Sequence, residues 1–160
     1  MTNERQYRGP LPSPDFRNQI ADEVMAPFTD IISGEIVARV VRPLGIARYK
    51  GKIKSVNLTV GKDGKDDAGQ HPSITGEVFI NGVSVFTTKP GICHITGETS
   101  QQKTTYAEAA DTGVLAATID ETANTFEVGD YLSWEAKYNG NASPTSKMSN
   151  VGIIVEVEPL

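Results

Sequence analysis

A succession of short strand patterns, separated by turn residues and without a helical pattern between them, most strongly restricts the fold of this chain. Asn81-Gly82 stands between two apolar runs and favours a type I′ hairpin, because both of its positions take a positive φ. Strands of this kind predict an all-β protein, an antiparallel β-sandwich of jelly-roll type. The expected strands are Ile36–Val41, Lys52–Val60, Ile74–Ile80, Val83–Thr88, Ile92–Ile95, Val114–Ile119, Thr125–Val128, Tyr131–Tyr138 and Val151–Val157.

The alternation of side chains along these strands predicts which residues form the core. In Lys52–Val60 it places Val56 on the same face as Lys54, and Ile53 on the opposite face. Each of the last two strands has one apolar face, formed by Leu132, Trp134, Ala136 and Tyr138 and by Val151, Ile153, Val155 and Val157. We therefore expect the single tryptophan, Trp134, in the core.

The N-terminal residues differ in character, and we expect an N-terminal arm over residues 1–34 before a β-sandwich domain over residues 35–160. Prolines favour an extended backbone in the arm, and Ser13-Pro14 resembles the start of a helix. Apolar residues at helical spacing predict one short helix, which must dock on its own domain or on a neighbouring molecule. The expected partner-binding residues of the arm are Pro10, Leu11, Pro12, Phe16, Ile20, Val24, Met25 and Phe28.

The charge of the chain argues against one class of partner. Its 160 residues include 15 Lys and Arg against 20 Asp and Glu, a net charge of −5, whereas nucleic-acid binding needs cationic surface. No run approaches the roughly 18 apolar residues that span a bilayer, and the first residues lack the apolar core of a signal peptide. With Cys93 as the single cysteine, no disulfide can form within the chain, which indicates production in a cytoplasm. We expect neither a nucleic-acid partner nor a membrane partner.

The sequence contains no pattern typical of a catalytic site. Cys93 and His94 are adjacent, and adjacent side chains of a strand point to opposite faces, so they cannot form a nucleophile and its base. A pair of Cys93 with His71 would depend on the tertiary fold, and a buried structural cysteine is the alternative. The familiar hydrolase and phosphate-loop motifs are absent. We expect no catalytic residues, no cofactor and no enzyme activity.

Three aspartates lie in the glycine-rich segment 61–70 and suggest calcium. Asp63, Asp66 and Asp67 do not have the alternating spacing, the central glycine and the final glutamate of a calcium loop. We interpret the segment as a solvated turn and predict no metal site.

Two strands carry apolar side chains on both faces, which indicates a contact beyond the strand's own sheet. In the Asn-Gly hairpin, Phe79 and Phe86 fall on the face opposite the apolar valines, and in the first strand Val37 and Val41 flank Arg39. A self-contained monomer exposes little contiguous apolar surface. The residues expected at a contact between subunits are therefore Val37, Arg39, Val41, Phe79 and Phe86, unless other parts of the same chain cover them.

The β region also carries a resemblance, on the segments VNLTV, EVFINGVSVF, VGDYLSWEAKY and VGIIVEVEPL. It resembles the jelly-roll decoration or cement proteins of tailed-phage capsids, and a related pattern occurs in phage head-fibre and tail-fibre modules. The resemblance covers roughly 110 residues and has no catalytic residues to transfer. It implies a virion structural protein on the outer capsid surface, made in the host cytoplasm. It further implies a homotrimer whose N-terminal arms reach over the major capsid protein and bridge neighbouring coat subunits.

A binding module of a phage fibre, which recognises carbohydrate or a host receptor, is the alternative. Sugar-binding surfaces usually present exposed aromatic rings. Because Trp134 is expected in the core, Tyr106, Tyr131 and the phenylalanines of the hairpin are the residues left for such a role. This arrangement favours the structural function.

Overall fold

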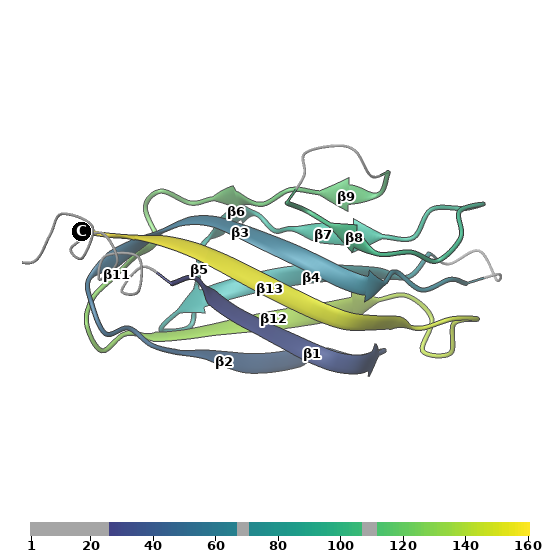
Figure 1. Ribbon diagram of the computed structural model, residues 1–160, viewed down its shortest axis with the longest axis horizontal. Coiled ribbons are helices and arrows are strands. Elements are labelled where there is room, and N and C mark those ends of the chain that lie inside the picture. Colours follow the sequence, from purple (N-terminus) through teal and green to yellow (C-terminus); the bar gives the residue numbers. More distant parts are fainter. Residues whose placement is uncertain (1–25, 67–70, 107–111) are drawn as a thin grey trace, which may run out of the picture.

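The computed structural model describes residues 26–66, 71–106 and 112–160. These residues form an all-β structure of antiparallel strands without a helix (Figure 1). The predicted short helix lies outside them, as do all the expected arm residues except Phe28. None of the described residues belongs to a helix that could cross a membrane. The strands are β1 (Phe28–Ile36), β2 (Val40–Ile46), β3 (Gly51–Lys62), β4 (Ser73–Ile80), β5 (Val83–Ser84), β6 (Phe86–Thr88), β7 (Gly91–Cys93), β8 (Lys103–Thr104), β9 (Val114–Leu115), β10 (Thr118–Ile119), β11 (Thr125–Phe126), β12 (Tyr131–Asn139) and β13 (Met148–Pro159).

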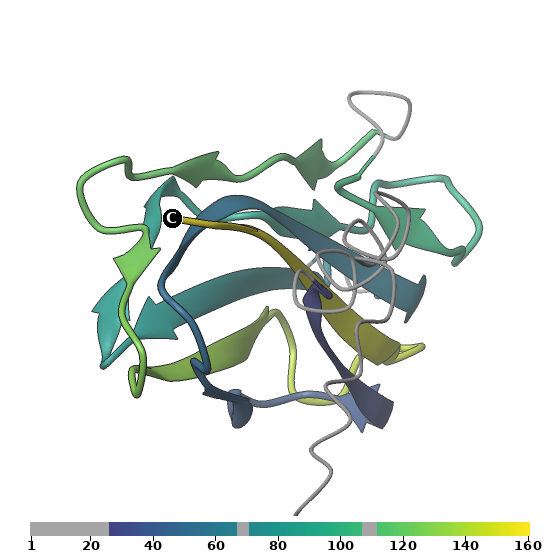
Figure 2. The ribbon, with the colours of Figure 1, turned by 60° about the vertical axis from the view of Figure 1, so that its left-hand side comes forward.

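Two larger sheets enclose one hydrophobic core. The first has the order β1-β13-β3-β11 with β8 added to β3, and the second has the order β2-β12-β4-β7-β9 with β5 added to β4. Strands β10 and β6 form a separate pair. Figure 2 shows the long strands of the two sheets as separate layers. The layers pack closely, because a Cβ added at Gly76 of β4 would lie 3.1 Å from Leu58 Cδ1 of β3. The arrangement is a β-sandwich.

The Asn-Gly hairpin forms as the sequence predicts. Asn81 and Gly82 have φ values of 51° and 83°, and Ile80 pairs with Val83 across the turn. The Val85 backbone N–H donates to the Val78 carbonyl at 3.1 Å, and both valine side chains are fully buried. The hairpin therefore contributes Val78 and Val85 to the core, whereas Val83 beside the turn is 60% exposed.

The faces predicted for the last two strands are also confirmed. Leu132, Trp134, Ala136 and Tyr138 of β12 and Val151, Ile153, Val155 and Val157 of β13 are all buried. Trp134 Nε1 donates to Asp30 Oδ2 at 2.9 Å, and Arg42 Nε lies 3.2 Å from the same oxygen. Because Asp30 belongs to β1 and Arg42 to β2, this contact joins the two sheets beside the tryptophan.

The alternation predicted for Lys52–Val60 is wrong at its beginning. Ser55 pairs with Glu156 and Ile53 with Val157, so two steps along β3 match one step along β13. The extra residue, Lys54, forms a β-bulge and is exposed. The bulge reverses the alternation, and as a result Ile53 is buried in the core together with Val56.

The first sheet begins earlier than the expected domain boundary at Glu35. Strand β1 starts at Phe28, which pairs with Val155 and contacts the Phe126 ring edge-on at a centroid distance of 6.4 Å. A register shift between Ile32 and Glu35 interrupts this strand, and Gly34 within it has a φ of 86°. This irregularity removes the period of two by which the strand could have been recognised.

Strand β2 is irregular as well. Leu132 pairs with Gly45 but Ser133 pairs with Pro43, so Leu44 is an extra residue on β2. Pro43 has no N–H to donate, and this restricts it to an edge strand. Strands β1 and β2, each at the end of its sheet, are therefore both interrupted.

Candidate functional site

The outward-facing side of the second sheet is the first candidate site. Residues that pair across antiparallel strands share a face, so Ile46 lies beside Tyr131, and Val41 beside Glu135. Likewise, Phe79 lies beside Ser133, and Glu77 beside Glu135. We call this surface the β12 outer face and define it by Val41, Ile46, Glu77, Phe79, Tyr131, Ser133, Glu135 and Lys137.

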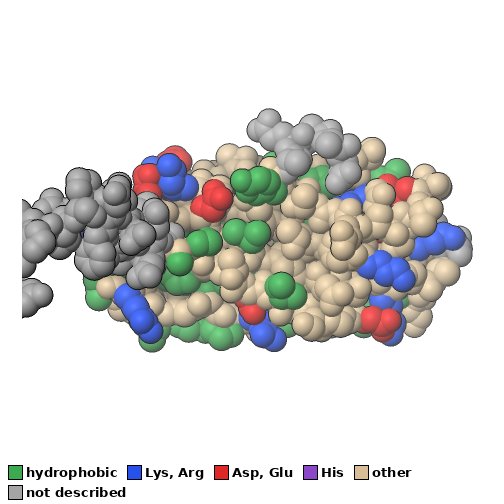
Figure 3. Space-filling view, viewed as in Figure 1, with side chains coloured by type: hydrophobic (Ala, Val, Ile, Leu, Met, Phe, Trp, Pro, Cys, Tyr) green, Lys and Arg blue, Asp and Glu red, His purple; other side chains and the backbone are tan. Residues whose placement is uncertain are grey.

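The β12 outer face has an apolar part along β2. Ile46 is 61%, Val41 53% and Tyr131 46% exposed. Figure 3, drawn from the viewpoint of Figure 1, shows hydrophobic side chains scattered mainly over the left-hand half of the face in view, some of them along the lower edge, where Figure 1 places β2. Exposed apolar side chains that lie together are typical of a surface that contacts another molecule.

The remainder of the β12 outer face is a charged groove. Glu77 and Glu135 lie directly opposite each other on β4 and β12. Two like charges in this position repel each other and would destabilise the sheet if neither had a partner of opposite charge. A base offsets each acid: Arg39 Nη2 lies 2.6 Å from Glu135 Oε2, and Lys89 Nζ lies 2.5 Å from Glu77 Oε2. The hydrogen bond to Glu135 raises the pKa of Arg39. The Glu135 side chain is only 8% exposed, although it faces outward.

This groove has a volume of about 300 Å³ and is lined by Thr75, Glu77, Lys89, Glu135, Lys137 and Asn139. Each glutamate has a cation beside it, so one carboxylate oxygen of each takes part in an ion pair. Thr75, Lys137 and Asn139 add further polar groups to the lining. The groove can therefore bind polar groups.

The structure brings together three of the five residues expected at a contact between subunits. Arg39, Val41 and Phe79 lie on or beside the β12 outer face. Val37 is exposed between β1 and β2. Phe86 is separated from Phe79, because it pairs with Ile119 of β10 and packs against the core.

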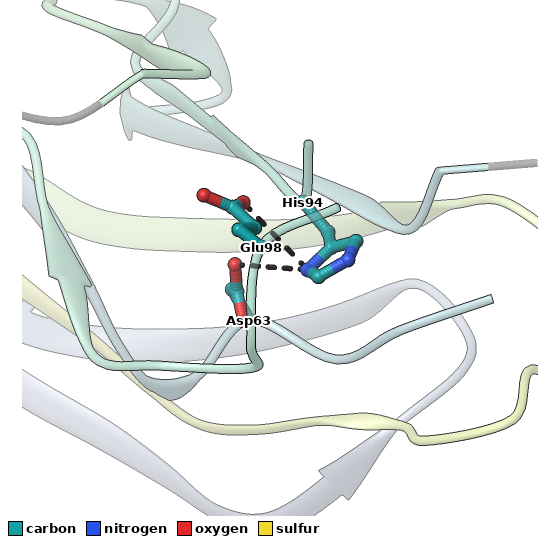
Figure 4. Close-up of side chains that lie close together, drawn as sticks. All are labelled: Asp63, His94 and Glu98. Carbon is teal, nitrogen blue, oxygen red and sulfur yellow. Dashed lines mark hydrogen bonds and ion pairs between the residues drawn. The ribbon is translucent and has the colours of Figure 1, made fainter. Parts of the chain in front are cut away.

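A buried cluster of charged side chains is the second candidate site. Asp63 follows β3, His94 follows β7, and Glu98 lies in the loop that leads to β8. His94 Nδ1 lies 3.3 Å from Asp63 Oδ2 and 3.6 Å from Glu98 Oε1. Figure 4 shows both carboxylates directed toward this ring nitrogen. Asp63 is fully buried and Asp66 is buried as well, so the interpretation of their segment as a solvated turn is wrong for these two residues.

Lys103 supplies the positive charge of this cluster. Its Nζ lies 2.5 Å from Glu98 Oε1 and 3.3 Å from Asp63 Oδ2, and its side chain is fully buried. It also donates to the carbonyls of Cys93 and Thr112, at 2.9 Å each. Asp63, His94 and Glu98 have the spacing of a metal site, but a metal ion there would have to displace the Lys103 ammonium. We call Asp63, His94, Glu98 and Lys103 the buried charge network.

The remaining residues considered for nucleophilic chemistry have other partners. The Cys93 thiol donates to the His94 carbonyl at 3.2 Å, and burial raises the pKa of this thiol. His71 Nε2 lies 2.8 Å from Thr96 Oγ1. These contacts fit a structural cysteine better than an activated one, because a reactive cysteine needs a lowered pKa.

Comparisons with known proteins add little to this description. No protein family matches the chain, and no curated protein matches it. One solved structure, titled Desmodium yellow mottle tymovirus, is similar at 13% sequence identity over 84% of this chain and 87% of that chain. The TM-score of this match is 0.27. A match at this score supports no conclusion about the present chain.

Proposed function

We propose that this protein is a virion structural protein of a tailed phage, a decoration or cement protein that binds the outer surface of the capsid. The observation that carries the proposal is the β12 outer face, on which Val41, Ile46 and Tyr131 are exposed beside two ion-paired glutamates. Such a surface fits contact with another folded protein, because apolar side chains supply affinity and charges fix orientation. No enzyme activity is part of the proposal.

In this proposal the β-sandwich is a jelly roll that forms a homotrimer. The β12 outer face is the contact between copies, and the N-terminal arm binds the major capsid protein. Proline-rich segments lose less conformational freedom when they bind, which favours an arm of this composition as the capsid contact. The trimers bridge neighbouring coat subunits and so stabilise the particle. Production in the host cytoplasm and the absence of nucleic-acid and membrane partners follow from this assignment.

The first test is the presence of the protein on particles. Tailed-phage particles produced from the genome that encodes this chain are purified, and their proteins are identified by mass spectrometry. We expect the chain on intact particles, and we expect particles that lack it to lose their DNA at a lower temperature. Purified particles without the chain would contradict the proposal.

A matched pair of variants tests the contact between copies. Ile46 of the β12 outer face and Ile31 of β1 are both 61% exposed and lie on opposite sheets. We expect Ile46→Glu to shift the native mass of the protein toward the monomer, while Ile31→Glu leaves the trimer intact. An equal effect of both variants, or of neither, would refute the assignment of this face.

The alternative function is a fibre module that binds carbohydrate or a host receptor. Tyr131 and Tyr106 are exposed, and Tyr131 lies on the same face as the charged groove. Exposed aromatic rings can stack on sugars. A glycan array distinguishes the two functions, because a specific ligand whose binding requires Tyr131 would favour the fibre module.

A further inference from the structure

Two residues of the buried charge network lie close enough to react with each other. Lys103 Nζ is 3.3 Å from Asp63 Oδ2 and 2.5 Å from Glu98 Oε1. We propose that Lys103 and Asp63 form an intramolecular isopeptide bond, with Glu98 as the group that transfers the proton. This modification does not depend on the proposed function.

The fold holds the two reacting groups at the same point. Lys103 pairs with Val60, whose side chain lies in the core, so the lysine side chain also points inward. Asp63 follows the end of β3, and its backbone N–H donates to the Gln101 carbonyl at 3.0 Å. Both side chains are fully buried. Groups held about 3–3.5 Å apart in a fixed geometry react far faster than free groups in water.

The surroundings of Asp63 suit attack on its carboxyl carbon. The Gln101 backbone N–H donates to Asp63 Oδ1 at 2.8 Å, and a donor at this oxygen stabilises the negative charge that develops during attack by an amine. His94 Nδ1 lies 3.3 Å from the other oxygen, Oδ2. An imidazole at this position can assist the departure of Oδ2 as water.

The surroundings of Lys103 hold its nitrogen and provide a proton acceptor. The carbonyls of Cys93 and Thr112 each accept a hydrogen bond from Nζ at 2.9 Å. Glu98 Oε1, at 2.5 Å, can take the third proton of the ammonium. A carboxylate oxygen of Glu98 also lies within 4.8 Å of one of Asp63, so a small movement of Glu98 brings the proton to Asp63. The transfer converts an ammonium and a carboxylate into a neutral amine and a neutral acid, which a dry site tolerates better than two charges.

The reaction is balanced without a cofactor. The neutral Lys103 amine attacks Asp63 Cγ, and a bond forms between Nζ and Cγ. The bond between Cγ and Oδ2 breaks, and Oδ2 leaves as water with the proton of the acid and one proton of the amine. The product is an amide that joins the end of β3 to β8. One water molecule is lost, and nothing is oxidised or reduced.

Mass spectrometry of the full chain tests the proposal. After purification and denaturation, we expect a mass about 18 Da below that of the sequence, the mass of one water. Protease digestion should give a branched peptide in which Asp63 is joined to Lys103. A chain of full mass after prolonged incubation at neutral pH would overturn the proposal, because the four groups would then form only a permanent ion-pair network.

A variant distinguishes the isopeptide bond from a second reaction of Asp63 that would also lower the mass by one water. Asp63 precedes Gly64, and an Asp-Gly step can lose water by cyclisation on its own backbone. Lys103→Arg keeps a cation but cannot form the amide, so its mass should equal that of its sequence. A persistent loss of water in this variant would identify cyclisation and overturn the proposal.

Substitution of the proton-transfer group provides the kinetic test. Glu98→Gln should slow bond formation at least about 100-fold, the lower range of general acid–base catalysis. Glu127→Gln, an exposed control, should react as the parent does. Equal rates in both variants would exclude Glu98 from the step. The branched peptide of the unaltered chain remains decisive if a variant fails to fold.

Discussion

Replacement of Trp134 by alanine should remove the largest single contribution to the core. Trp134 is fully buried and is the largest by volume of the fully buried residues that the structure describes. Replacing a buried tryptophan by alanine costs about 3–5 kcal/mol. The change also removes the donor to Asp30, whose loss adds about 1 kcal/mol. The expected loss in the free energy of unfolding is therefore about 4–6 kcal/mol, a large part of the roughly 5–15 kcal/mol of a typical domain.

Urea denaturation followed by far-UV circular dichroism measures this loss without depending on tryptophan fluorescence. Tyr106→Ala is the control, because Tyr106 is an aromatic residue that is 65% exposed and lies outside the β12 outer face. We expect this variant to lose less than about 1 kcal/mol, as surface substitutions do. The reasoning would be refuted if Trp134→Ala lost less than about 1.5 kcal/mol, or no more than Tyr106→Ala.

Three further predictions concern the start of the chain, the groove and acid stability. Deletion of residues 1–25 should leave the melting temperature nearly unchanged but weaken particle binding at least about tenfold, or about 1.4 kcal/mol. Deletion of residues 1–32 should lower the melting temperature as well, because it removes the first half of β1. Arg39→Ala should lower the melting temperature more than Arg48→Ala, because it leaves the buried Glu135 carboxylate without its cation; equal effects would contradict this role. Hydrogen bonds from the Glu127 backbone and Asn81 lower the pKa of Asp130. The ionised Asp130 therefore stabilises the folded state at pH values above its unfolded pKa of about 3.9. This stabilisation is lost as the pH falls through the lower pKa of the folded state. Thermal melts of the parent and Asp130→Asn between neutral and acid pH should converge on acidification, and parallel curves would disprove the linkage.

Regular strands were predictable from the sequence, whereas irregular ones were not. The period of two in β12 and β13 gave the correct core face, and the positive φ favoured by Asn-Gly gave the correct hairpin. The same period placed Ile53 on the wrong face, because Lys54 forms a bulge that depends on pairing with β13. Strand β1 was missed for a similar reason, since the irregularity near Gly34 interrupts its alternation.

The buried charge network had no signal in the sequence. Its four side chains come from three separate segments, and only the fold brings Asp63, His94 and Lys103 together. A charged residue in a glycine-rich segment is usually solvated, which explains the wrong interpretation of Asp63. The separation of Phe86 from Phe79 was equally hidden, because it depends on pairing between β6 and β10.

The interruptions in β1 and β2 have a consequence for self-association. An unbroken edge strand offers a row of free N–H and C=O groups on which a further strand, and then a fibril, can grow. In this protein the bulge near Gly34 disturbs that row in one sheet, and Leu44 with Pro43 disturbs it in the other. Copies crowded together at high local concentration are therefore hindered from adding strand to strand at β1 and β2, and can still meet there through the faces of their sheets.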